Sequence, residues 1–280
     1  MVMFGDSGDS DSMGWGGAVF LGILFVVIPQ VRMIQYVCRV SRLRFPVAHV
    51  LALAGTVFGG LLLLVCALLF YGAKEVRTDI GPVVFLTGLG GAWSITAVML
   101  FPWLGLSIRD DAMERRNPAA LLALLGALLA VQLTFAAGNL GEGPSYWNNV
   151  FSAALGTGGL LCLWFMLELG GRVSASIAEE RDVASGVTLG GFLVASGLIL
   201  ARAVAGDWHS ASATLHDFLR DGRPAAGLWL LALVMEWLLR PSRRRPFPFW
   251  PVSGLLPALL YLTLAATWLY QLGRWEGFPK

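Results

Sequence analysis

Five polar or charged side chains fall inside long apolar stretches of this sequence, where side chains capable of chemistry are rare. They are Arg32, Glu168, Glu236, Gln132 and Arg202. Because ionisable groups are costly inside a membrane, such residues commonly mark ion or proton paths. The carboxylates of Glu168 and Glu236 would then act as relays. The alternative, favoured because no charge is predicted at mid-depth, is that Arg32 pairs with a carboxylate or extends its side chain toward the headgroups.

No catalytic signature accompanies these residues. The sequence lacks a Walker loop, a His-Glu-x-x-His motif, a Gly-x-Ser-x-Gly motif and any cysteine pair with metal-ligand spacing. His209 and His216 stand seven residues apart and could share a helical face, although solvated histidines are the simpler interpretation. His49 is more simply a packed or capping side chain. We therefore predict no enzyme activity, no catalytic residue, no cofactor and no metal site.

Transmembrane helices are the elements that would position these side chains. Of the 280 residues, 56% are apolar and 14% are charged, and the mean hydropathy is +0.69. Soluble domains carry about 25% charged residues, and a helix crosses a bilayer with about 20 apolar residues. We therefore predict an all-α, polytopic membrane protein with about eight spans. The expected spans are 15–38, 46–71, 82–107, 118–138, 150–171, 184–205, 224–240 and 250–272.

A repeated pattern of small residues suggests how these spans are organised. Gly-x-Gly-Gly sequences begin at Gly14, Gly88 and Gly156, near the start of the first, third and fifth spans. Each following span carries small residues at offsets of 0, 4, 7 and 11, which fall on one helical face. These packing stripes are Ala48, Ala52, Gly55 and Gly59; Ala119, Ala123, Gly126 and Ala130; and Ala184, Thr188, Gly191 and Ala195. Small residues let membrane helices approach closely, so we expect the three stripes to meet.

The chain then divides into three tandem two-helix units, 14–72, 82–138 and 150–206, and a divergent helix pair over 224–280. The alternative is that alanine and glycine are simply common in membrane spans. Residues 1–13, acidic and rich in serine and glycine, are predicted to be a disordered tail. The segment 207–221 places its apolar residues on one face, which predicts an amphipathic helix lying on the outer membrane surface.

The distribution of basic residues predicts the orientation. Twelve of the 20 lie in the loops around 39–44, 109–116, 172–181 and 240–245, and six lie in the opposite set. The positive-inside rule therefore places the first set in the cytoplasm and both termini outside. The arginine-rich run from Arg240 to Arg245 is a plausible contact for anionic lipid headgroups. It could equally do no more than enforce topology.

Asn117 and Asp182 each directly precede a predicted span. A side-chain oxygen at this position satisfies an unpaired amide of the first helical turn, so both are expected to be N-caps. Pro118 fits this interpretation because proline is favoured at the first helical position. A ligand site is the alternative.

Local sequence around these two residues resembles a known family. The stretch Asn117-Pro118-Ala119-Ala120, and the stretch from Glu180 to Gly186 that leads into Ser196-Gly197-Leu198-Ile199, resemble the paired repeats of the YjfL-like bacterial transmembrane proteins, domain of unknown function 350. The likeness covers about residues 82–207. Asn117 matches the polar residue that precedes small residues in that family, whereas Asp182 and Pro46 depart from it. The resemblance implies a multipass protein of the bacterial inner membrane and supplies no catalytic residues.

Three classes of function follow from these patterns. The first expectation is a non-enzymatic membrane component that works by assembly with itself or with partners, in envelope maintenance. The second is a channel or transporter that uses the intramembrane charges around a cavity. An intramembrane enzyme is the third, and the missing motifs weaken it. Besides lipid, the expected partners are a second copy of the chain or another membrane protein; nucleic acid is not expected.

Overall fold

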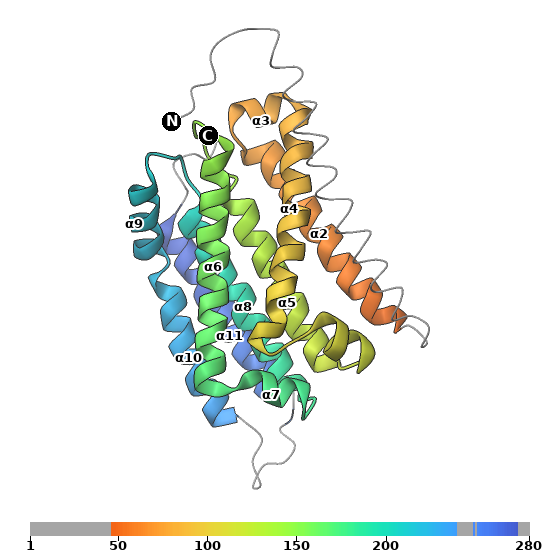
Figure 1. The fold of residues 1–280 in the computed structure, drawn as a ribbon. Coiled ribbons are helices and arrows are strands. Elements are labelled where there is room, and N and C mark those ends of the chain that lie inside the picture. The colour runs from red at the N-terminus through yellow and green to blue at the C-terminus, as the bar shows by residue number, and fades with distance from the viewer. Residues whose placement is uncertain (1–45, 240–248, 250, 274–280) are drawn as a thin grey trace.

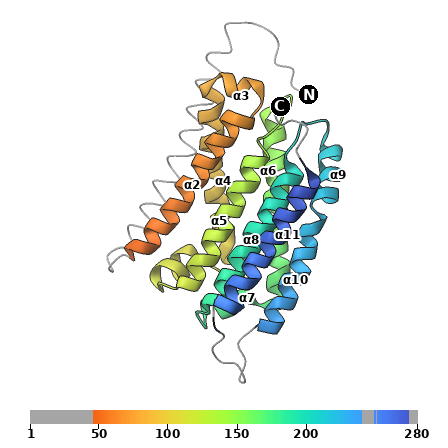
Figure 2. The ribbon, with the colours of Figure 1, turned by 180° about the vertical axis from the view of Figure 1, so that it is seen from behind.

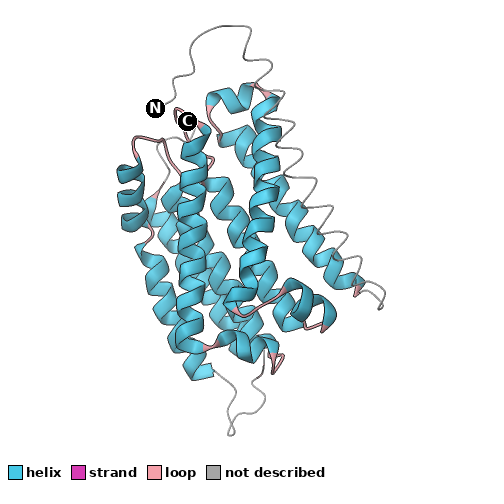
Figure 3. Cartoon of the chain, in the orientation of Figure 1, coloured by secondary structure: helices cyan, strands magenta, loops and turns pink. Residues whose placement is uncertain are grey.

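The computed structural model describes residues 46–239, 249 and 251–273 of the chain, and over these residues it contains helices and no strand (Figure 3). The longer helices are α2 (Val47–Tyr71), α4 (Ile80–Leu100), α5 (Pro118–Ala137), α6 (Tyr146–Gly171), α8 (Val183–Val204), α9 (Ala211–Asp221), α10 (Arg223–Leu239) and α11 (Leu256–Leu272). The shorter ones are α3 (Lys74–Thr78), α7 (Val173–Ala178), the 3-10 helix η1 (Phe101–Leu104) and the π-helices η2 (Ile108–Glu114) and η3 (Pro251–Leu255). The all-helical class predicted from the sequence is confirmed for this part of the chain.

Six helical segments of the described chain are long and apolar enough to cross a membrane, and a bent pair could form a seventh. The six are α2, α4 with η1, α5, α6, α8, and η3 with α11. They match six of the eight predicted spans. The predicted seventh span is α10, whose 17 residues follow α9 at a bend of 41°. The predicted first span, 15–38, and with it Arg32, lies outside the described residues.

The helices form two layers. One layer is a row in the order α2, α5, α8 and α11, which is clearest in Figure 2. The other contains α4, α6 and α10, which lie in front of this row in Figure 1. Each helix of the front layer packs against helices of the row: α4 against α2 and α5, α6 against α5 and α8, and α10 against α8 and α11. We call the two ends of this bundle the α3 end and the α7 end, after the short helices that lie there.

The centre of the bundle is the contact between α5 and α8. Every residue of the predicted α5 stripe is buried, and a Cβ added at Gly126 would lie 2.5 Å from the Cα of Gly190. A Cβ at Gly186 would lie 2.4 Å from the carbonyl oxygen of Ala119. The two backbones therefore touch, as small residues allow.

The stripes do not all meet as predicted. On α8, the row that faces α5 contains Gly186, Gly190 and Gly197, whereas the predicted row faces η3 and α11. Within that predicted row, a Cβ at Gly191 would lie 2.4 Å from the Cβ of Ala258. The helix α8 thus presents one small face to α5 and another to η3 and α11, and spacing alone does not reveal which face meets which neighbour.

The predicted stripe of α2 differs more. No atom of the described residues lies within 4 Å of a Cβ built at Gly55 or Gly59. The adjacent Gly60 instead faces α5, where an added Cβ would overlap the side chain of Gln132. Consecutive residues point about 100° apart on a helix, so a one-residue difference moves the stripe off the contact. The expectation that Gly55 joins the shared interface is wrong for the described part of the chain.

The predicted amphipathic segment 207–221 forms a helix over only part of its length. α9 begins after Ser210, whose hydroxyl accepts a hydrogen bond from the Ala213 amide at 3.1 Å. Trp208 lies outside the helix and stacks edge-on against Phe151, with ring centroids 5.5 Å apart. Phe218 is half-buried and packs against the core, and no side chain of α9 is fully buried. The orientation of this helix on a membrane surface stays a prediction.

Candidate functional site

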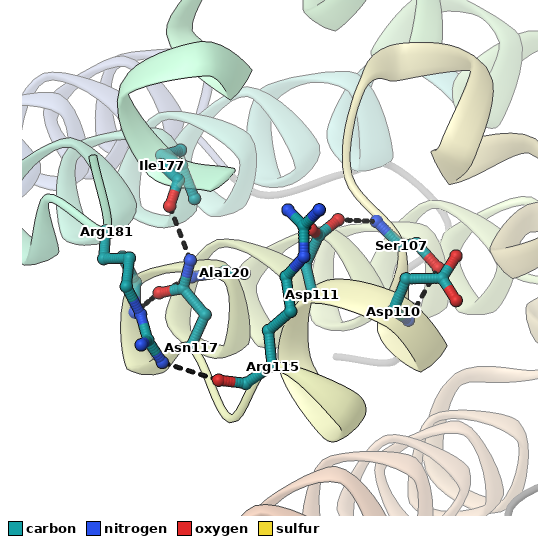
Figure 4. Close-up of polar contacts among 9 residues, drawn as sticks. Ser107, Asp110, Asp111, Arg115, Asn117, Ala120, Ile177 and Arg181 are labelled. Atoms are coloured by element: carbon teal, nitrogen blue, oxygen red, sulfur yellow. Dashed lines mark hydrogen bonds and ion pairs between the residues drawn. The ribbon is translucent and has the colours of Figure 1, made fainter. Parts of the chain in front are cut away.

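Most of the polar residues singled out in the sequence lie at the α7 end. Two helix starts there share one geometry, shown for Asn117 in Figure 4. Asn117 accepts hydrogen bonds from the amides two and three residues ahead, at 3.0 and 3.4 Å, and Asp182 does the same at 3.1 Å for both. In each case the cap's own amide donates to the carbonyl six residues earlier, at 3.1 Å. The structure therefore places both side chains at N-cap positions, where they satisfy amides that the helix leaves unpaired.

The residue before each cap is an arginine in the left-handed region. The φ angle is 51° at Arg116 and 58° at Arg181. This conformation is unfavourable for any residue with a Cβ, so surrounding contacts must hold it. Arg181 supplies some of them, because its guanidinium donates to the carbonyl oxygens of Arg115 and Arg116 at 2.6 and 3.0 Å. The loop before α8 is thus tied to the loop before α5.

Asn117 makes a second connection between the same loops. Its side chain is completely buried, and its Nδ2 donates to the carbonyl oxygen of Ile177, in α7, at 2.6 Å. One carboxamide therefore caps α5 and binds α7 at the same time. An amide can do this because it is both donor and acceptor, whereas the carboxylate of Asp182 can only accept.

A further polar cluster, which the sequence reasoning missed, precedes Asn117 (Figure 4). Asp111 is 7% exposed; its carboxylate accepts a hydrogen bond from the Ser107 amide at 2.8 Å and pairs with Arg115 at 3.3 Å. The Ser107 hydroxyl in turn accepts from the Asp110 amide at 3.1 Å. This reciprocal arrangement is close to a capping box. A serine followed by two aspartates is the local signal that would have indicated it.

Glu168 and Glu236 lie on two helices that pack together, α6 and α10. Glu168 accepts hydrogen bonds from the amide and hydroxyl of Ser174, at 2.9 and 2.5 Å. It therefore fastens the first turn of α7 rather than lining a path through the bundle. Glu236 is 5% exposed and lies on α10. The pairing predicted between Arg32 and one of these carboxylates involves a residue outside the described part of the chain.

Glu236 lines a small cavity at the α7 end, between α8, α10 and η3. Its volume is about 10 Å³, close to the minimum that holds one water molecule. The lining residues are Asp182, Ala184, Ser185, Thr188, Met235, Glu236, Leu239 and Ser253. Five of the eight side chains carry oxygen, so the lining of this cavity is largely polar.

The remaining polar residues stand apart from this cavity. Gln132 is buried in α5, and its Nε2 donates to the carbonyl oxygen of Val57 in α2 at 3.2 Å. Arg202 lies in the last turn of α8, where the helix dipole interacts favourably with a positive charge. His49 lies 2.8 Å from the Ala112 carbonyl oxygen through its Nδ1. These contacts join helices and loops to one another.

Among the described residues, no group of three or more histidine, cysteine, aspartate or glutamate side chains could hold a metal ion.

Comparison with known proteins adds no family to this description. The whole chain matches no protein-family model, no curated protein and no solved structure.

Proposed function

We propose that this protein is a non-enzymatic membrane component that works by assembly with a second copy of itself or with a membrane partner. The single observation that carries this proposal is a small-residue face of α2 that no described residue covers. Ala48, Gly55 and Gly59 are exposed, and no described atom lies within 4 Å of a Cβ built at either glycine. The comparable rows on α5 and α8 are closed by tight helix contacts.

The surroundings of this face support helix docking. In the described structure, 17% of the most apolar part of α2 is buried, compared with 72% for α5. Small residues on a lipid-facing helix permit a second helix to approach closely, and dispersion and weak polar contacts then stabilise the pair. The small residues of α2 would therefore allow a partner helix the same close backbone approach that α5 allows α8.

Oligomeric state in lipid nanodiscs or mild detergent tests this proposal. Gly55→Leu and Gly59→Leu should shift the protein toward the monomer while its thermal stability remains unchanged. Gly227→Leu is a matched control, because Gly227 is an exposed glycine on α10 that also has no described atom within 4 Å. A wild-type protein that is monomeric and binds no partner would refute assembly, as would equal effects at Gly55 and Gly227.

We also propose three finer features of this membrane component. The first is a tandem repeat, which is supported by the recurrence of the same cap, left-handed arginine and six-residue hydrogen bond at a spacing of 65 residues. The second is membership of the YjfL-like family, which rests on the resemblance near Asn117 and Asp182. The third is a bacterial inner-membrane location with both termini outside, which rests on the arginine-rich loops, with Arg240 to Arg245 facing anionic headgroups.

Ion or small-solute passage is a second candidate function. The polar cavity that contains Glu236 favours it, because buried polar groups in membrane helices often serve transport. Flux measured in proteoliposomes, with Glu236→Gln compared with the wild type, tests this candidate. Absence of flux for ions and small solutes would exclude it.

A further inference from the structure

The helix α9 descends along the wall of the bundle, beside the half of α6 that is nearer the α3 end (Figure 1). Just before α9, Trp208 stacks against Phe151, the sixth residue of α6. Near the end of α9, Phe218 contacts the fourteenth residue of α6, because a Cβ built at Gly159 would lie 2.7 Å from its Cζ. At a rise of 1.5 Å per residue, α9 therefore ends about 20 Å from the start of α6.

The contacts of α10 give the same depth for the break between α9 and α10. A Cβ built at Gly170 of α6 would lie 2.8 Å from the Cδ1 of Leu233. Arg223 begins α10 ten residues before Leu233, which is about 15 Å nearer the α3 end and level with Leu160 of α6. Since α6 runs from Tyr146 to Gly171, both estimates place the break close to the middle of α6.

Charged side chains are exposed at this break. The Arg220 side chain is 54% exposed and pairs with Asp221 at 2.8 Å and with Asp217 at 3.3 Å. Arg223 is also exposed, and its Nε donates to the Arg220 carbonyl oxygen at 2.9 Å. His216, 3.7 Å from Asp217, is exposed as well. The two arginines and two aspartates form a surface with no net charge, which we call the α9 charge patch.

The surface of α6 at the same depth is apolar. Gly158 is exposed, with no described atom within 4 Å of a Cβ built there, and Ala154 and Cys162 are the exposed residues one turn away on either side. The hydrocarbon core of a bilayer is about 30 Å thick, and the 26 residues of α6 are about 39 Å long. An α6 that crosses the bilayer therefore has hydrocarbon around Gly158. Charges at this depth are costly unless water or lipid headgroups reach them.

We propose that the α9 charge patch binds phospholipid headgroups and draws them toward the middle of α6, in the leaflet at the α3 end. A zwitterionic headgroup fits a patch without net charge, because its phosphate can bind an arginine while its ammonium group meets Asp217. Bilayers become thinner around short hydrophobic segments at a modest cost, and α10, with 17 residues, is such a segment. Headgroup binding here does not require assembly through α2, so a single copy of the chain would show it.

Cysteine accessibility in liposomes tests the depth of the polar surface. In a full-length variant without its native cysteines, single cysteines replace Arg223 or Gly158, which are both exposed at the same depth of the bundle. An impermeant maleimide, present on both sides of the membrane, should label Arg223→Cys about as fast as Glu142→Cys in the exposed loop at the α3 end. Gly158→Cys should stay unlabelled until the protein is denatured.

Bilayer thickness tests whether lipid headgroups are the bound group. In nanodiscs of phosphatidylcholine, Tm should be lower with acyl chains of about 22 carbons than with about 18, because headgroups must descend further to reach Arg223. Arg223→Leu should reduce this difference in Tm. Arg77→Leu, a matched change at an exposed arginine of α3, should leave it unchanged. Each variant is compared with itself in two bilayers, so its own stability does not affect the test.

Three results would overturn headgroup binding. An unlabelled Arg223→Cys in liposomes would place the patch in hydrocarbon or beneath another protein segment. Labelling of Gly158→Cys as fast as Arg223→Cys would place this whole level outside the bilayer. An equal effect of thickness in the wild type and in Arg223→Leu would mean that water alone solvates the patch. A monomeric wild-type protein would refute assembly through α2 and would change none of these results.

Discussion

Replacing Asn117 should be among the most damaging single changes in the described part of this protein. The side chain is completely buried; its Oδ1 caps α5 and its Nδ2 donates to the carbonyl oxygen of Ile177 at 2.6 Å. In Asn117→Ala, loss of the cap costs about 1 kcal/mol. The orphaned carbonyl of Ile177 costs about 1–3 kcal/mol more. The free energy of unfolding should therefore fall by about 2–4 kcal/mol.

Two matched variants separate these contributions. Asp182→Ala removes the equivalent cap from α8, but the Asp182 side chain is only partly buried and donates to no carbonyl, so its loss should cost about 1 kcal/mol. Asn117→Ser keeps a cap oxygen but cannot reach Ile177, so its stability should lie between those of the wild type and Asn117→Ala. Equilibrium unfolding in a graded denaturing detergent, followed by far-UV circular dichroism, measures all three. Equal losses for Asn117→Ala and Asp182→Ala, or wild-type stability for Asn117→Ser, would refute the bridging role.

Three further predictions follow from the described contacts. Gly126→Leu should lower the free energy of unfolding by about 1–3 kcal/mol, because the new side chain meets the backbone of α8; in the same detergent assay Gly158→Leu, where no described atom lies within 4 Å, should have little effect. Arg172→Gly should raise the free energy of unfolding by about 0.5–1 kcal/mol. The φ angle is 48° at Arg172, and glycine avoids the steric cost that a Cβ has in this region, which exceeds the extra conformational entropy that glycine loses on folding. A lower Tm for the variant would contradict this prediction. Single cysteines at Glu142 and Glu180, exposed at opposite ends of the bundle, should label oppositely with an impermeant maleimide, the first from outside. Labelling of Glu180 alone from outside would reverse the predicted orientation, and labelling of both from one side would refute it.

Features that depend on local sequence could be predicted. The apolar stretches from Pro46 onward correspond to helices, because a span needs only length and hydropathy. The N-cap positions of Asn117 and Asp182 were also accessible, because a cap acts on amides two and three residues away. The serine and two aspartates between Ser107 and Asp111 form a comparable local signal. It was missed because the arginines of this loop were used only to predict the orientation of the chain.

Only the tertiary structure decided which face meets which neighbour. Periodicity correctly grouped Ala119, Ala123 and Gly126 on one face. It could not show that α8 meets them through Gly190, or that Gly55 has no neighbour among the described residues. In a membrane protein, hydropathy does not separate these cases, because lipid and neighbouring helices are both apolar. Glu168 illustrates the same limit for polar groups: its partner is Ser174, across the turn into α7. The sequence by itself therefore determined the helices and their caps, whereas the packing of backbone on backbone decided the contacts and the cavity.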